Sequence, residues 1–216
     1  MTAKDLLEGK RILLVDDEPD VLDTLADLLP TCDTVKASNF EAARDYLETE
    51  YFNLAILDIM GVEGYRLLDI ANQRRVTSVM LTAHALSPEN IVKSFREGAA
   101  YYLPKEEMVN IASFLSDVLE ALEQGKSTWR SWNDRMGAFF EKKFGSQWQD
   151  DEKEFWERFP FYKTVLQSLI WLICQFDHCE PKYCCNLHAP HRAHPANQYG
   201  HRYARHIEHR KNHRRA

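Results

Sequence analysis

The chain has no hydrophobic run that approaches the roughly 18–20 residues needed for a membrane-spanning helix. Its first residues, Met1–Asp5, also lack the basic and then apolar pattern of a signal peptide. We therefore expect a cytoplasmic protein without a membrane partner. Cysteine is scarce, with Cys32 alone and four others between 174 and 185. This spacing does not indicate a disulfide framework.

Positive charge is scarce in most of the chain and concentrated at its end. Residues 178–216 hold eight Lys and Arg against two Glu, a charge of +6. Because the whole chain carries −6, the preceding 177 residues carry −12. An acidic surface argues against nucleic-acid binding by that part, whereas the basic tail leaves the question open.

Short apolar runs alternate with amphipathic segments over the first 124 residues. Strands are expected at 11–15, 31–37, 53–57, 77–81 and 99–103. Helices are expected at 19–29, 40–48, 65–72, 88–97 and 106–122, with caps at Asn39 and Ser87. Five βα units at this pitch predict an α/β fold, a doubly wound five-stranded parallel sheet, over residues 9–124. We find no internal repeat.

The composition changes at 124–127, which we interpret as a domain boundary. Residues 127–177 form a predicted α-helical, aromatic-rich extension, with helices at 129–144, 151–159 and 161–176. Its stripe of Trp and Phe is typical of packing rather than of a cofactor site. Residues 178–216 hold eight of the nine histidines and few aliphatic residues, so we expect a basic, disordered tail.

Acidic and basic residues stand directly after three of the predicted strands. Asp16 and Asp17 follow the first strand, Asp58 the third and Lys105 the fifth. Because the carboxyl ends of parallel strands share one edge of the sheet, these four side chains should meet in one pocket. Three carboxylates so close together need a cation, and Mg²⁺ is the simplest one for oxygen ligands.

This ordered set resembles the receiver domain of two-component response regulators, of the kind found in chemotaxis receivers. Thr82, with Ala83 beside it, follows the fourth strand, and Tyr102 lies three residues before Lys105. Acidic residues also follow strands in nucleotide-binding α/β folds. Taken singly, Thr82 could simply cap a loop, and Tyr102 could be an ordinary strand aromatic.

The resemblance implies a role for each residue. Asp58 would accept a phosphoryl group from a sensor histidine kinase or phosphotransfer protein. Asp17, Asp58 and the backbone carbonyl of Met60 would bind Mg²⁺, with Asp16 acting through water. Lys105 and Thr82 would contact the phosphoryl group. Thr82 would move toward that group, and Tyr102 would turn inward behind it. The face formed by 88–97, 99–103 and 106–122 would then bind a downstream protein or a second copy, as a homodimer.

The loop after Asp58 departs from the receiver pattern. It contains no proline and is shortened, with Gly61 in the place where a turn is needed. The rate of dephosphorylation is therefore an open question. A pseudo-receiver that serves as a scaffold is one alternative reading of the chain.

A DNA-binding transcriptional regulator that uses the C-terminal region is another alternative. DNA is not favoured, because the extension is acidic and shows no helix-turn-helix pattern. We expect no separate enzymatic domain, since the extension has no nucleophile–base set and no Gly-rich phosphate loop. The receiver itself would promote its phosphorylation and dephosphorylation. The Cys and His residues of the tail match no usual structural zinc spacing cleanly, so a metal site, an unfolded tail and a shifted reading frame all stay open.

Overall fold

The computed structural model describes residues 6–84 and 86–157. It contains β1 (Arg11–Val15), α2 (Pro19–Leu28), β2 (Asp33–Ala37), α3 (Phe40–Thr49), β3 (Leu54–Asp58), α4 (Gly64–Gln73), β4 (Thr77–Thr82), α5 (Pro88–Arg96), β5 (Tyr101–Pro104), η1 (Lys105–Asn110), α6 (Ile111–Glu123), α7 (Thr128–Phe144) and η2 (Asp150–Glu152). The alternation of strands and helices confirms the predicted α/β class.

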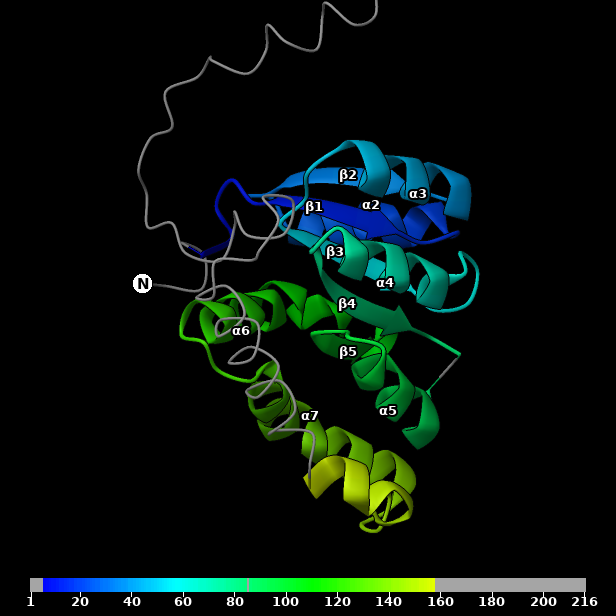
Figure 1. Cartoon of the computed structure of the whole chain (residues 1–216), viewed down its shortest axis with the longest axis vertical. Coiled ribbons are helices and arrows are strands. Elements are labelled where there is room, and N and C mark those ends of the chain that lie inside the picture. The colour runs from blue at the N-terminus through cyan, green and yellow to red at the C-terminus, as the bar shows by residue number, and fades with distance from the viewer. Residues whose placement is uncertain (1–5, 85, 158–216) are drawn as a thin grey trace, which may run out of the picture. The chain divides into compact units, whose positions relative to one another are not determined.

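The five strands form one parallel sheet in the order β2-β1-β3-β4-β5 (Figure 1). The chain moves one way along the sheet from β1 to β2 and the other way afterwards. Right-handed crossovers therefore place α2 on one face and α3, α4 and α5 on the opposite face. Helix α6 packs against α2 and so covers the first face. Both faces are covered, which is why β3 is buried along its whole length.

The helix starts follow from local chemistry. The Asn39 side chain accepts a hydrogen bond from the backbone N–H of Ala42 (2.9 Å), and that of Ser87 accepts from Asn90 (3.2 Å). Both caps were expected from the sequence. Pro19 and Pro88 occupy the first turns of α2 and α5, where a missing N–H costs nothing.

Several boundaries differ from the sequence prediction. Strand β2 begins at Asp33 rather than at 31, and β5 begins at Tyr101 rather than at 99. Residues 105–110, expected as the start of the last helix, form the 3₁₀ helix η1. Val109, which lies inside the helix expected at 106–122, is part of this 3₁₀ helix and is 69% exposed.

The C-terminal extension begins as predicted, with α7 packed against α6 and β5 (Figure 1). The described residues, 6–84 and 86–157, belong to one compact unit that includes α7. After η2, residues 153–157 are helical, within the helix expected at 151–159. The predicted helix at 161–176 and the tail at 178–216 lie outside the described residues. The domain bounds 9–124, 127–177 and 178–216 stay predictions.

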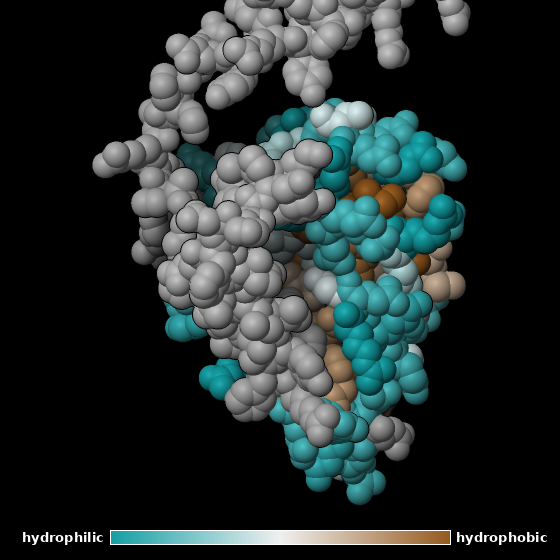
Figure 2. All heavy atoms as spheres, in the orientation of Figure 1, coloured by the Kyte–Doolittle hydropathy of each residue, from teal (hydrophilic) through white to brown (hydrophobic). Residues whose placement is uncertain are grey.

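Strand β5 lies at the edge of the sheet, yet all four of its residues are buried. An edge strand exposes a row of backbone groups unless another element covers it. Helix α7 supplies that cover, with Trp132 and Phe140 fully buried. The part of the surface that is visible in Figure 2 is mostly hydrophilic, with apolar residues showing between the helices. Among residues 6–84 and 86–157, no helix is both long enough and apolar enough to span a membrane.

Candidate functional site at the carboxyl edge of the sheet

The parallel register brings the predicted site residues to one edge. Val15 pairs with Leu57, so Asp16 and Asp58 both stand one residue beyond that pair. Thr82 pairs with Pro104, which places Lys105 one residue further on. Asp16, Asp58 and Thr82 are all buried. The juxtaposition expected from three short apolar runs is therefore present in the fold.

Lys105 is the cation at the centre of this cluster. Its Nζ lies 2.8 Å from Asp16 Oδ2 and 3.3 Å from Asp58 Oδ1. A third carboxylate, that of Glu18, lies 2.9 Å away on the exposed side. Glu18 was not among the predicted site residues. Its place in the acidic run Asp16-Asp17-Glu18, just before α2, is the signal that could have identified it.

The electrostatics of the cluster reflect burial and pairing. Burial raises the pKa of Asp16 above its ordinary value, although the Lys105 ammonium opposes that rise. Burial alone would lower the pKa of Lys105, but its hydrogen bonds to Asp16 and Glu18 raise the pKa overall. The lysine therefore stays charged throughout the physiological range. In turn it lowers the pKa of Glu18.

The shortened loop after β3 wraps closely around Asp58. Asp58 Oδ2 accepts hydrogen bonds from the backbone N–H groups of Met60 (2.9 Å) and Gly61 (3.1 Å). The Asp17 carboxylate packs so close to Gly61 that a Cβ there would overlap it. A Cβ on Gly64 would overlap the backbone carbonyl of Asp58. Close approach to backbone therefore requires glycine at position 64, whereas at position 61 the neighbouring group is a side chain.

The carboxylates at this edge of the sheet can be compared with what a divalent metal ion needs as ligands. Within the described part of the chain, no three His, Cys, Asp or Glu side chains are arranged together as a metal cage. Asp16 and Asp58 face Lys105 instead, while Asp17 is exposed beside Gly61. Mg²⁺ usually keeps several water ligands and needs only one or two protein carboxylates. Asp17 and Asp58, which both contact Gly61, satisfy that requirement.

Thr82 and Tyr102 occupy neighbouring strands at the same end of the sheet. The Tyr102 ring is fully buried, and its inward turn behind Thr82 stays a prediction. Burial raises the pKa of Tyr102 far above its ordinary value, and a hydrogen bond with the Ser87 backbone partly offsets this rise. Tyr102 therefore contacts the loop that begins at Thr82.

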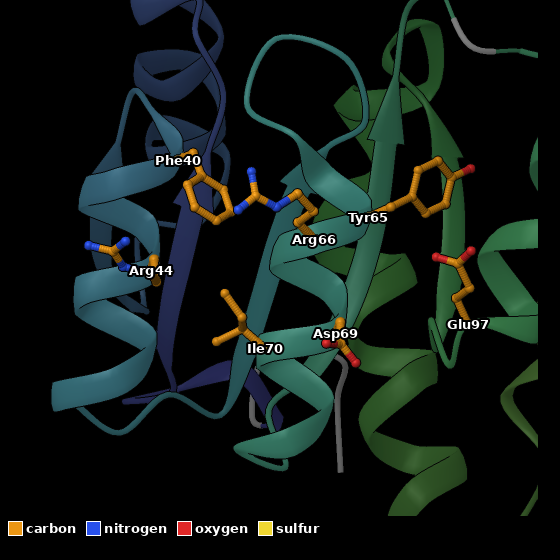
Figure 3. Close-up of a pocket in the computed structure, with 7 residues that line it drawn as sticks. All are labelled: Phe40, Arg44, Tyr65, Arg66, Asp69, Ile70 and Glu97. Carbon is orange, nitrogen blue, oxygen red and sulfur yellow. The ribbon is translucent and has the colours of Figure 1, made fainter.

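A separate hollow of about 470 Å³ lies between α3 and α4 (Figure 3). It is lined by Phe40, Arg44, Tyr65, Arg66, Asp69, Ile70 and Glu97. The Arg66 guanidinium stacks over the Phe40 ring at 4.2 Å, and the two side chains point toward each other in the close-up. None of the carboxylates at the sheet edge lines this hollow, so the two sites are distinct.

Comparison with known proteins decides the family. Residues 12–114 match the family described as response regulator receiver domain. A CheY-like response regulator receiver domain from Methanospirillum hungatei is 30% identical, with a TM-score of 0.50, over 55% of this chain and 99% of that one. The chain belongs to the response regulator receiver family. The match runs from β1 to the first residues of α6.

Two other relatives set the limits of this likeness. The two-component response regulator ARR18 of Arabidopsis thaliana is 32% identical over 113 residues, which are 48% of this chain and 18% of that protein. A signal receiver domain from Vibrio parahaemolyticus shares the fold, with 22% identity and a TM-score of 0.50 over 54% of this chain and 95% of that one. The family match ends at residue 114, before α7 begins.

Proposed function

We propose that this response regulator accepts a phosphoryl group on Asp58 from a sensor histidine kinase or a phosphotransfer protein. The observation that carries the proposal is the position of Lys105, whose ammonium lies within 3.3 Å of both Asp16 and Asp58 at the carboxyl edge of the sheet. A buried carboxylate next to a fixed cation is arranged to accept a charged group.

The chemistry follows from the same contacts. A carboxylate oxygen of Asp58 attacks the phosphorus of a phosphohistidine, so that a P–O bond forms while the P–N bond breaks. The histidine nitrogen leaves with the electron pair of that bond and takes up a proton. The N–H groups of Met60 and Gly61 fix the orientation of the Asp58 carboxylate. Lys105 then offsets the negative charge that the phosphoryl group brings.

Asp17, Asp58 and the backbone carbonyl of Met60 would hold a Mg²⁺ ion, with Asp16 acting through water. When bound, the ion neutralises charge on the attacking and transferred oxygens. Thr82 would donate its hydroxyl to a phosphoryl oxygen. The same receiver would promote hydrolysis of its own acyl phosphate, at a rate that the shortened loop 58–64 influences.

We further propose that phosphorylation changes the position of Thr82 and Tyr102 and that the signal passes on by protein–protein contact. The downstream protein and the cognate kinase would be recognised outside the cluster of carboxylates. A homodimer is one form such a contact could take. We propose a cytoplasmic location, where sensor kinases present their phosphohistidine.

The test is the mass of the intact protein after incubation with acetyl phosphate or phosphoramidate, with and without Mg²⁺. We expect one base-labile phosphoryl adduct that requires Mg²⁺ and is absent in Asp58→Asn. Asp27→Asn is the matched control, because Asp27 is an exposed carboxylate on α2. An adduct that persists in Asp58→Asn would contradict the assignment of Asp58. The absence of any adduct on folded wild-type protein would favour the scaffold reading instead.

A further inference from the structure

Helix α7 covers the face of the receiver formed by α5, β5 and α6, the face from which the sequence predicted readout to a partner (Figure 1). Polar contacts tie the extension to three parts of this face. Arg96 of α5 pairs with Glu152 at 2.8 Å, and Lys143 of α7 pairs with Glu106 of η1 at 2.8 Å. Arg135 of α7 pairs with Asp117 of α6. An external partner at this face would have to displace α7.

The apolar contacts beneath α7 converge on Tyr102. The Trp132 indole Nε1 donates a hydrogen bond to the Tyr102 carbonyl oxygen at 2.6 Å. The rings of Tyr102 and Phe140 lie 6.2 Å apart, within the range of favourable aromatic pairs. All three residues are fully buried. Helix α7 therefore contacts both the backbone and the ring of Tyr102.

The hydroxyl end of the Tyr102 side chain contacts the loop that follows Thr82 at the end of β4. Its hydroxyl has a hydrogen bond with the backbone of Ser87, which ends the segment that starts at Thr82. Tyr102 thus bridges the loop after β4 and the inner face of α7.

We propose that α7 is the receiver's own output element, and that its docking is coupled through Tyr102 to phosphoryl occupancy of Asp58. The inference rests on the proposed function of Asp58. Docked α7 buries the Tyr102 ring beside Phe140, and the proposed switch turns the same ring inward when Asp58 is phosphorylated. Two events that favour the same position of one side chain strengthen each other, and the coupling is reciprocal. Phosphorylation tightens the docking of α7, and docked α7 raises the affinity of the site for a phosphoryl group.

The first measurement is amide hydrogen exchange in the full chain, with Mg²⁺ and with or without beryllofluoride as the phosphoryl mimic. We expect exchange in residues 128–144 to slow by about fivefold or more on addition of the mimic, in line with typical allosteric coupling. The change should be absent in Asp58→Asn. Unchanged or faster exchange in α7, in protein that binds the mimic, would overturn the coupling.

The reciprocal measurement uses substitutions in α7. Trp132→Phe removes the indole donor but keeps an aromatic ring, and Phe140→Leu keeps apolar volume while removing the ring contact. Each should raise the beryllofluoride concentration for half-occupancy, followed by ¹⁹F NMR, by about fivefold. Arg130→Ala is the control, because Arg130 is exposed on the same helix. Wild-type affinity in both Trp132→Phe and Phe140→Leu would overturn the proposal.

Formation of the phosphoryl adduct distinguishes failure of the proposed function from failure of the coupling to α7. If wild-type protein forms no acyl phosphate and binds no beryllofluoride, the proposed function fails, and this inference fails with it. If the adduct forms on Asp58 while α7 and its variants behave as the control does, only the coupling through Tyr102 is wrong.

Discussion

At the scale of single residues, the site depends on how closely charged groups and backbone approach each other. Asp58 is held by two backbone N–H groups on one oxygen and by Lys105 on the other. Gly61 and Gly64 make this possible, since each lies where a side chain would overlap a neighbour. Neither glycine has a positive φ, so glycine is favoured at these positions by the lack of room for a side chain rather than by backbone conformation.

The two glycines should respond differently to substitution by alanine. In Gly61→Ala the new methyl group meets the end of the Asp17 side chain, which can rotate away. We expect the free energy of unfolding to fall by less than about 1 kcal/mol, because an exposed side chain yields easily. Mg²⁺ affinity should fall by about tenfold, equivalent to about 1.4 kcal/mol, because a displaced carboxylate no longer faces the ion.

Gly64→Ala is the matched comparison for this experiment. Its methyl group meets the backbone carbonyl of Asp58, which cannot rotate away. We expect a loss of about 2 kcal/mol in the free energy of unfolding, as for other overpacked sites. Urea denaturation measures the stability of both variants, and isothermal titration calorimetry measures Mg²⁺ binding. Unchanged Mg²⁺ affinity in Gly61→Ala would contradict the placement of Asp17 as a ligand.

At the scale of elements, α7 packs on α5 through an aromatic cluster and on α6 beside one partly buried ion pair. The rings of Trp129 and Trp132 stack at 4.9 Å, and the Phe95 ring of α5 meets both edge-on. Beside them, Arg135 binds Asp117 and donates to the hydroxyl of Ser113 at 2.9 Å. Burial raises the pKa of Asp117, while the charge of Arg135 opposes that rise.

Arg135→Ala should make stability depend more strongly on pH. Without the guanidinium, the partly buried Asp117 carboxylate is left without its cationic partner. We expect the free energy of unfolding to fall by about 1 kcal/mol at pH 7. The value is modest because the Arg135 side chain is 41% exposed. A carboxyl with a raised folded-state pKa costs stability above that pKa and not below its unfolded value. The loss should therefore shrink as pH falls from 7 toward 4.5.

Urea denaturation at both pH values measures this effect, with Arg130→Ala as the control on the same helix. The control should stay within about 0.5 kcal/mol of wild type at each pH. If Arg135→Ala lowers the free energy of unfolding by the same amount at pH 7 and pH 4.5, the destabilisation comes from lost packing rather than from the unpaired Asp117.

At the scale of the whole molecule, the receiver and α7 share one core. The family match covers only the receiver, but Trp132, Met136 and Phe140 join the same buried cluster as the residues of β5. The described part of the extension, up to residue 157, therefore packs into the same core as the receiver. This arrangement leaves the edge strand β5 covered, while charged side chains such as Lys36 mark the opposite edge, β2.

A shared core predicts a single unfolding transition. All five tryptophans lie between 129 and 171, beyond the receiver, whereas far-UV circular dichroism reports mostly on the receiver. In a Trp171→Phe background, the four remaining tryptophans all belong to the shared buried cluster, so the fluorescence reports on that cluster. We expect the fluorescence and circular dichroism midpoints in urea to coincide, as two-state unfolding requires. A separate fluorescence transition at lower urea would show that α7 detaches before the receiver unfolds.

Much of this protein could be predicted from local sequence. Short apolar runs fixed the strands, Asn39 and Ser87 fixed helix starts, and the position of each charged residue after its strand fixed the edge on which it lies. These features depend on neighbours in the chain, and parallel pairing then needs only the right-handed crossover. Local pattern was less reliable at 105–110, where acidic residues open a 3₁₀ turn and Val109 faces solvent.

Only the tertiary structure decided three things. Glu18 joined the site because Lys105, 87 residues away, reaches it. Gly64 became critical because the backbone carbonyl of Asp58 lies against it. Tyr102 is buried because α7 returns over β5, and nothing in either segment alone specifies that contact. Periodicity shows that a helix has an apolar face, but the partner of that face depends on which surfaces the rest of the fold leaves uncovered.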